Sequence, residues 1–222
     1  MAVQTGQNAN GPLGENRSRK KSLTENLIFG LILAMILSDK DILEKIKKGE
    51  IKIEPFDKNC VQPSTVDLHL SSEIRVFDNW QHGVVDVKEK VDVSRLIKIK
   101  KEGFIIHPGE FLLGSTVEKI TLPNNIAAKL EGRSSLGRLG LVIHATAGYV
   151  DPGFSGWLTF ELSNLSRLPI RIYPEMKIAQ ICFFQMSSPV LRPYGAKGLG
   201  SKYQGQKGPT PSRTWMDFKN EK

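Results

Sequence analysis

The sequence contains only two cysteines, Cys60 and Cys182, which lie far apart and form no Cys-x-x-Cys pair. A disulfide framework or a structural zinc site is therefore not expected, and the free thiols predict a reducing, cytoplasmic setting. The sequence also lacks a Gly-x-x-x-x-Gly-Lys-Ser/Thr loop, a zinc-finger spacing and an aromatic RNA-binding signature. These absences exclude a P-loop nucleotidase and argue against a nucleic-acid-binding module.

The sequence also lacks a long block of like charge and an apolar run long enough to span a bilayer. The formal charge of +8 is spread along the chain without a long basic block. A triphosphate, which needs only a few Lys and Arg, accounts for this charge as well as a polynucleotide would. We expect a small phosphorylated ligand and no nucleic acid. The apolar run Leu27–Leu37 is shorter than the about 20 residues that span a bilayer, so no membrane partner is expected.

The composition divides the chain into three parts. Residues 1–34 combine a Gln/Asn/Gly-rich start with the basic patch Arg17–Lys21. A signal peptide would end in a small-residue cleavage site, and none follows here. We predict that they are a disordered or weakly helical extension, or that they precede a native start at Met35. Residues 35–191 are predicted to form one β domain. Residues 192–222 are predicted to form a Gly/Lys-rich lid and tail.

After residue 35 the apolar pattern predicts one short helix followed by strands. Ser38 has the character of a helix cap, and Gly49 that of a stop. The period then changes from helical spacing to two. The strand candidates are Val66–Leu70, Ile74–Phe77, Phe104–Ile106, Glu110–Val117, Ile126–Leu130, Leu141–His144, Leu158–Leu162, Ile170–Tyr173 and Ile178–Gln185. Because Pro or Gly punctuates most of the gaps, the pattern predicts an all-β barrel or jelly-roll sandwich.

Two carboxylates stand where a binding or catalytic group would be useful. Asp151 opens an Asp-Pro-Gly turn, where it could bind a sugar hydroxyl or orient a water, although capping the turn is its commoner role. Glu161 lies between Phe160 and Leu162 in a predicted strand, so it points away from them, toward solvent or a cavity. In a cavity it could shuttle a proton. His144 is expected to be a core histidine that makes one hydrogen bond.

Two further segments could bind phosphate. Arg133–Arg138 follows a predicted strand and could present backbone N–H groups, hydroxyls and guanidinium groups to phosphate oxygens, although such clusters are also common in solvated loops. After Pro193, glycines alternate with Lys197, Lys202 and Lys207. This tail is either a floppy basic segment or an ordered lid over a ligand. We expect the lid.

Six separated blocks together carry a resemblance to a known family. They are MILSDKDI from Met35, QPSTVDLHL from Gln62, GRSSLGRLGL from Gly132, TAGYVDPGFSG from Thr146, FELSN from Phe160 and SKYQGQKGPTPSR from Ser201. Over about residues 35 to 213 the chain resembles the dCTP deaminase branch of the dUTPase superfamily. The resemblance implies a distorted jelly-roll, a homotrimer with active sites between subunits, and Mg²⁺ bound through the nucleotide triphosphate without protein side-chain ligands.

The resemblance also implies roles for individual residues. Glu161 matches the general acid/base that activates water for attack on C4 of cytosine, and Ser134 and Arg138 match residues that position the water and the base. Asp151 completes the catalytic set. The substrate-binding positions that it implies are Arg133, Ser134, Ser135, Leu136, Gly137, Arg138, Asp151, Thr159, Phe160, Glu161, Tyr194, Lys202 and Gln206. Zinc is not expected, because the His-x-Glu and Pro-Cys-x-x-Cys motifs of zinc-dependent nucleobase deaminases are missing.

One departure bears on the product. Family members that release dUTP carry His or Thr and then Arg where this chain has Gly148 and Tyr149, a pattern that instead resembles dUTPases and bifunctional dUMP-forming dCTP deaminases. We therefore expect a hydrolase that converts dCTP to dUMP, ammonia and diphosphate, with water oriented by Asp151 attacking the α-phosphorus. The alternatives are a deaminase that releases dUTP and, third, a dUTPase. A further alternative is a non-catalytic nucleotide sensor or trimeric scaffold. Finding Glu161 on an outer sheet face would favour it.

Overall fold

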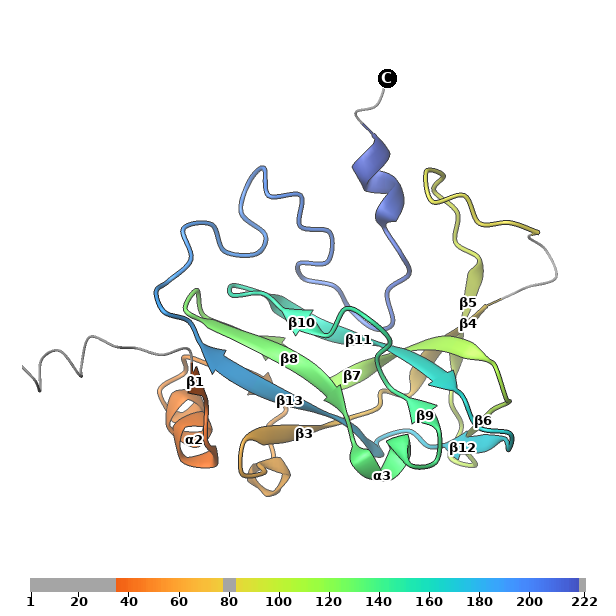
Figure 1. Ribbon diagram of the computed structural model, residues 1–222, viewed down its shortest axis with the longest axis horizontal. Coiled ribbons are helices and arrows are strands. Elements are labelled where there is room, and N and C mark those ends of the chain that lie inside the picture. Colours follow the sequence, from red (N-terminus) through yellow and green to blue (C-terminus); the bar gives the residue numbers. More distant parts are fainter. Residues whose placement is uncertain (1–34, 78–82, 220–222) are drawn as a thin grey trace, which may run out of the picture. The chain divides into compact units, whose positions relative to one another are not determined.

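The computed structural model describes residues 35–77 and 83–219, so the prediction for residues 1–34 lies outside the described residues. Strands dominate, and the predicted mostly-β fold with one short N-terminal helix is confirmed (Figure 1). The elements are β1 (Met35–Ile36), α2 (Asp39–Lys47), β2 (Lys52–Glu54), η1 (Lys58–Cys60), β3 (Thr65–His69), β4 (Glu73–Phe77), β5 (Ser94–Lys98), β6 (Phe104–Ile106), β7 (Phe111–Thr121), β8 (Ile126–Gly132), α3 (Ser134–Gly137), β9 (Leu141–Val142), β10 (Tyr149–Val150), β11 (Ser155–Asn164), β12 (Ile170–Ile172), β13 (Lys177–Gln185) and η2 (Thr214–Phe218).

Helix α2 forms where the capping pattern predicts it. The Ser38 side chain accepts a hydrogen bond from the backbone N–H of Asp41, which satisfies one of the free donors of the first turn. Ile42, on the inner side of the helix, is completely buried. Gly49 follows the helix with a φ of +72°, a conformation that glycine adopts without strain. The helix therefore ends at the predicted residue.

The strands form two antiparallel sheets and a separate strand pair. The first sheet has the order β1-β13-β8-β10, with β3 also pairing with β13; the second has the order β5-β4-β7-β11-β9, with β2 also pairing with β7. Strands β6 and β12 form the separate pair. Buried side chains of both sheets join one hydrophobic core. Neither sheet closes on itself, and the arrangement is a distorted jelly-roll.

Strand β5 was not predicted from the sequence. It pairs with β4 over its whole length, yet most of its side chains are exposed or only half-buried, and Leu96 is 50% exposed. A strand that buries neither face leaves no clean alternation of apolar and polar residues in the sequence. Pattern reading therefore misses an edge strand of this kind.

Strand β11 decides which side chains reach the functional site. Its residues alternate strictly between buried and half-buried positions, and Phe160 and Leu162 are completely buried in the core. Thr159 and Glu161 lie on the opposite face. The alternation thus directs both polar side chains away from the core.

Candidate active site

A cavity of about 580 Å³ lies on the polar face of β11. Its walls come from β7, β11, the segment from His144 to Phe154, the loop before β5 and the C-terminal tail. Five of the sequence-predicted site residues line it together: Asp151, Thr159, Glu161, Tyr194 and Gln206. A cavity of this size is in the range of small-ligand sites.

Glu161 is held in this cavity by the loop that follows β9. Its Oε2 atom accepts hydrogen bonds from the backbone N–H groups of Ala145 (3.1 Å) and Thr146 (3.3 Å). Within the described chain, the hydrogen bonds to this carboxylate all go to Oε2, which leaves Oε1 available to a water molecule. Glu161 therefore lies in a cavity with one oxygen fixed and one free, and not on an outer sheet face.

His144 borders the same cavity. Both of its ring nitrogens are buried, and neither has a hydrogen-bond partner among the described residues. The prediction of a core histidine with one hydrogen bond was wrong in this respect. Buried polar atoms are rarely left unsatisfied in a folded protein, so these nitrogens indicate a place for a bound molecule or water. No feature of the sequence separates this histidine from a core histidine.

The turn around Asp151 links β10 to β11. A Cβ atom at Gly148 would lie 2.7 Å from the carbonyl oxygen of Leu130, so only glycine fits at this position. The next residue, Tyr149, is 57% exposed and lines the cavity. Asp151 itself is exposed and lines both this cavity and the one described next.

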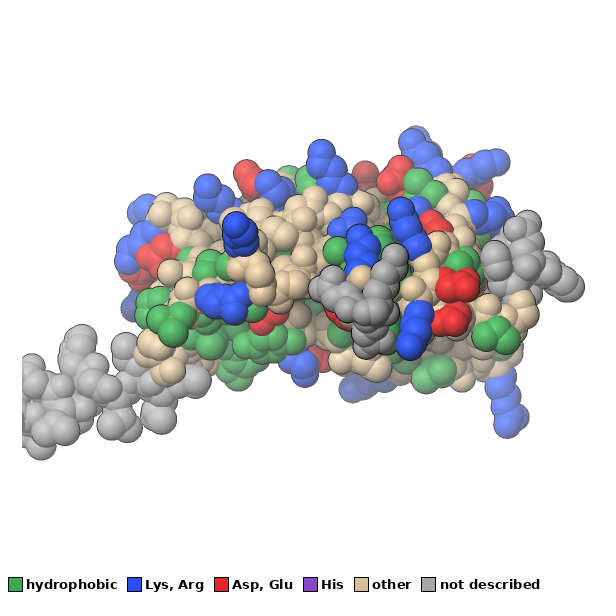
Figure 2. Space-filling view, turned by 90° about the horizontal axis from the view of Figure 1, so that it is seen from above, with side chains coloured by type: hydrophobic (Ala, Val, Ile, Leu, Met, Phe, Trp, Pro, Cys, Tyr) green, Lys and Arg blue, Asp and Glu red, His purple; other side chains and the backbone are tan. Residues whose placement is uncertain are grey.

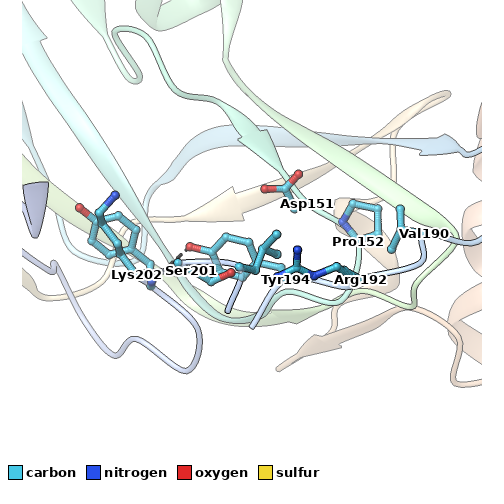
Figure 3. Close-up of a pocket in the computed structure, with 10 residues that line it drawn as sticks. Asp151, Pro152, Val190, Arg192, Tyr194, Ser201 and Lys202 are labelled. Carbon is cyan, nitrogen blue, oxygen red and sulfur yellow. Dashed lines mark hydrogen bonds between the residues drawn. The ribbon is translucent and has the colours of Figure 1, made fainter. Parts of the chain in front are cut away.

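A second cavity of about 400 Å³ adjoins the first, because Asp151, Tyr194 and Tyr203 line both. Arg192 and Lys202 bring two cationic groups to it, and Lys202 also forms an ion pair with Asp217 at 2.7 Å. Figure 3 shows Asp151 on one side of this cavity, with Tyr194 and Arg192 of the tail across from it. The two cavities together provide a largely apolar compartment that holds Glu161 beside a compartment with two cationic side chains.

The C-terminal tail lies in an ordered path along β11. The Gln206 side chain donates a hydrogen bond of 2.7 Å to the carbonyl oxygen of Trp157, and the backbone N–H of Thr210 donates to Oγ1 of Thr159. The N–H group of Tyr203 donates to the Tyr194 hydroxyl at 3.1 Å. Tyr203 belongs to the SKYQGQ block, but its place in the cavity wall was not predicted. Residues of the tail thus form part of the cavity wall.

Arg75 joins the C-terminal tail to the rest of the cavity wall. Its Nε atom donates to the carbonyl oxygen of Pro209 at 2.9 Å, and its Nη1 atom donates to Asp92 at 2.8 Å and to the Ser94 hydroxyl at 3.0 Å. Burial opposes ionisation of Asp92, but the hydrogen bonds from Ser94 and Arg75 outweigh it and lower the pKa of Asp92. One guanidinium group therefore fixes the tail and the β5 edge together.

Replacing Arg75 with Ala is expected to lower the free energy of unfolding by about 1–2 kcal/mol, because four acceptors, including the Ser94 carbonyl oxygen, lose a charged donor. The Asp92 pKa is lower in the folded state, so this stabilisation is present above the unfolded carboxyl pKa of about 4 and is lost as the pH falls through the folded value. Urea unfolding at pH 7 and pH 3 measures the change. Arg171→Ala, which removes one bond to the carbonyl oxygen of Glu102, is the control. Equal losses in the two variants would contradict the anchoring role of Arg75.

Two predicted binding elements lie outside both cavities of this chain. The segment Arg133–Arg138, which contains α3, lines neither of them. Arg133 instead forms an ion pair with the buried Asp67 (3.4 Å), while Ser134, Ser135 and Arg138 are exposed. The Phe160 side chain is in the core, so only its backbone can contribute to a site. The segment and the cavity that contains Glu161 are therefore not brought together within one chain.

The charged surface and the helices carry further information on possible ligands. Figure 2 shows Lys and Arg side chains scattered over one face, with apolar and acidic side chains between them. In the described part of the chain, no helix is both long enough and apolar enough to cross a membrane. The same residues contain no cluster of three His, Cys, Asp or Glu side chains suited to a metal ion.

The fold and the site define a jelly-roll protein with a glutamate-bearing cavity under its own C-terminal tail. This chain belongs to the dCTP deaminase-like family, whose model matches residues 36–186. The dUMP-forming dCTP deaminase of Corynebacterium kroppenstedtii is 54% identical over 187 residues, which are 83% of this chain and 100% of the relative. That of Thermobifida fusca is 53% identical over 190 residues, 85% of this chain and 97% of the relative.

A solved structure supports the fold independently. The 2′-deoxycytidine 5′-triphosphate deaminase of Agrobacterium tumefaciens superposes with a TM-score of 0.54 and 23% sequence identity. The superposition covers 68% of this chain and 48% of that chain, so this chain spans about half the length of that protein. At this level of identity the likeness establishes the fold alone.

Proposed function

We propose that this protein is a hydrolase that deaminates dCTP and then releases diphosphate, giving dUMP, ammonia and diphosphate. The observation that carries the proposal is the position of Glu161, fixed by two backbone N–H groups on the wall of a 580 Å³ cavity that Asp151 also lines. The names of the curated relatives support the same reaction. The product would supply dTMP synthesis while keeping dUTP scarce.

The deamination step uses the free oxygen of Glu161. This carboxylate takes a proton from a water molecule, the hydroxide adds to C4 of cytosine, and the same proton passes to the amino group, which leaves as ammonia. The two backbone hydrogen bonds to Oε2, of 3.1 and 3.3 Å, support an orientation of this carboxylate that does not depend on substrate. His144, with two unpartnered nitrogens in the same cavity, is available to bind the base or an ordered water.

The second step, release of diphosphate, uses the adjoining cavity. Asp151 stands between the two cavities and orients a water for attack on the α-phosphorus, while Arg192 and Lys202 offer positive charge to the diphosphate that leaves. A Mg²⁺ ion carried by the triphosphate would add further charge neutralisation there, with phosphate oxygens and water as its ligands. Tyr194 and Gln206 of the tail line the larger cavity, which contains Glu161.

We further propose that the active form is a homotrimer whose sites lie between copies. The exposed segment Arg133–Arg138 carries two arginines and two serines but lines neither of the two cavities described above. A neighbouring copy can bring this segment to the cavity of the first, where Ser134 and Arg138 would position the water and the base.

The free thiols of Cys60 and Cys182 are compatible with a protein that works in the cytoplasm.

The product distinguishes the two-step reaction from its alternatives. When the purified protein is incubated with dCTP and Mg²⁺, we expect dUMP and diphosphate to appear together without a pool of dUTP. Chromatography of the nucleotides and phosphorus NMR measure both products. Accumulating dUTP would show a deaminase without the second step, and turnover of dUTP but not dCTP would show a dUTPase. Asp151→Asn is the matched variant, and it should slow diphosphate release.

A further inference from the structure

A third cavity, of about 410 Å³, shares no lining residue with the two cavities described above, although Asp67 on its wall pairs with Arg133. Its walls include the apolar side chains of Ile53, Phe56 and Val117, contributed by the segment around β2 and by β7. Cys60, His69 and Glu118 also line it. The proposed reaction uses none of these three residues.

These three side chains form a chain of contacts between the two sheets. His69 at the end of β3 lies with Nδ1 2.5 Å from Oε1 of Glu118 on β7, and Glu118 Oε2 also accepts the backbone N–H of His69. The other ring nitrogen, Nε2, is 4.0 Å from Sγ of Cys60. Since Glu118 accepts from Nδ1, the neutral ring presents Nε2 as an acceptor to the thiol. This is the order of nucleophile, base and orienting carboxylate found at activated thiols.

The thiol depends on this base. Burial raises the pKa of Cys60, an effect that the nearby Lys177 ammonium group only partly offsets. The resting group is therefore a neutral thiol at pH 7, and it becomes a nucleophile when a neighbouring group takes its proton. Glu118 has only 5% of its side chain exposed, so the orientation of the His69 ring is fixed from the inside of the fold.

We propose that Cys60, His69 and Glu118 form a second reactive site, at which Cys60 is modified by small uncharged disulfides and similar soft electrophiles. The proton of the Cys60 thiol moves to Nε2 of His69, and the sulfur attacks one sulfur of the disulfide. The disulfide bond breaks, a new S–S bond joins that sulfur to Cys60, and the other half leaves as a thiolate that takes the proton. No further oxidant is needed, because the disulfide is itself reduced.

The charges around the cavity select among such reagents. Of its carboxylates, Asp67 is paired with Lys177 and Arg133, and Glu118 accepts from the His69 ring and backbone. Glu175 also lines the cavity and has no ion pair in the described chain. Asp57 likewise has none, and its Oδ2 accepts a hydrogen bond from the Cys60 thiol at 3.8 Å. An anionic reagent would meet this carboxylate, so a neutral one is favoured.

Site-resolved labelling of the full-length protein tests the proposal. Neutral iodoacetamide and 2-hydroxyethyl disulfide are used in separate experiments, and mass spectrometry follows Cys60 with Cys182 as the internal reference. In His69→Gln the rate at Cys60 is expected to fall at least about 10-fold, because the general base is lost, while Cys182 reacts as before. In the wild type, anionic iodoacetate should label Cys60 more slowly than iodoacetamide, relative to Cys182.

A second variant separates the chemistry from stability. His69→Asn keeps an N–H donor for Glu118 but cannot take the thiol proton, so Cys60 should again react slowly in a protein whose thermal midpoint is closer to that of the wild type. Wild-type rates at Cys60 in either variant would overturn the proposal. So would faster labelling of Cys60 in a destabilised His69→Gln, which would show that the thiol reacts only after unfolding. The readout is labelling, so it is independent of activity toward dCTP.

Discussion

Replacing Glu161 with Gln is expected to lower the rate of ammonia release from dCTP by about a thousandfold, within the range that a general acid/base contributes. The amide keeps an oxygen that accepts the N–H groups of Ala145 and Thr146, so the loop after β9 stays in place. It cannot take a proton from water at neutral pH. The loss should therefore fall on kcat, with KM and the thermal midpoint almost unchanged.

A matched control uses a glutamate that has no part in the cavity. Glu44 lies on helix α2, where it forms an exposed ion pair with Lys48. Glu44→Gln should keep full activity, because exposed ion pairs contribute little to stability. Ammonia release and circular-dichroism melting are measured for both variants. If Glu161→Gln turned over dCTP at the wild-type rate, Glu161 would not be the general base, and a binding or scaffolding role would become the better explanation.

Mixing two inactive variants is expected to restore activity. Arg138→Ala should be inactive because the segment Arg133–Arg138 is incomplete, and Glu161→Gln because the cavity lacks its base. If each site combines the segment of one copy with the cavity of another, random co-assembly gives sites with both parts intact at about one quarter of the wild-type number, or about one third once purification has removed trimers of a single variant. Co-expression with two different affinity tags, followed by tandem purification and an ammonia assay, measures the restored fraction.

The control for this experiment pairs two variants of the same cavity. Asp151 and Glu161 line one cavity of one chain, so every cavity in an Asp151→Asn and Glu161→Gln mixture carries one defect. Ammonia release from dCTP, counted per Asp151→Asn subunit, should then show no gain over that variant alone. Formation of dUMP is not the readout, because dUTP released from one cavity can be hydrolysed in another. If Arg138→Ala and Glu161→Gln also failed to complement each other in purified mixed assemblies, the segment and the cavity would act within one chain. Arg138 is exposed, so its replacement should leave folding unaffected.

The sequence pattern was sufficient wherever a side chain's position follows from local periodicity. Alternation around Phe160 and Leu162 predicts that Glu161 points to the other face of its strand, and the structure has it there. The cap at Ser38 and the stop at Gly49 likewise placed helix α2. Such features depend on neighbours in the chain, because strand and helix geometry fixes the direction of each side chain.

Other features have no local signal. The exposed strand β5 lacks alternation, and His144 looks like a core residue in the sequence although its nitrogens are unpartnered in the cavity. The array of Cys60, His69 and Glu118 joins residues from both sheets, and no spacing predicts it. Each depends on contacts between segments far apart in the chain, which the sequence pattern does not encode explicitly.

The sequence by itself thus determined the class of fold, the family resemblance and the residue types of the site, because periodicity, turn residues and ordered motif blocks are all read along the chain. Only the tertiary structure decided which of those residues meet. It placed Glu161 and Asp151 in one cavity under the tail, and left the segment Arg133–Arg138 outside that cavity. The physical reason is that antiparallel pairing of distant strands, and not sequence order, sets which side chains share a wall.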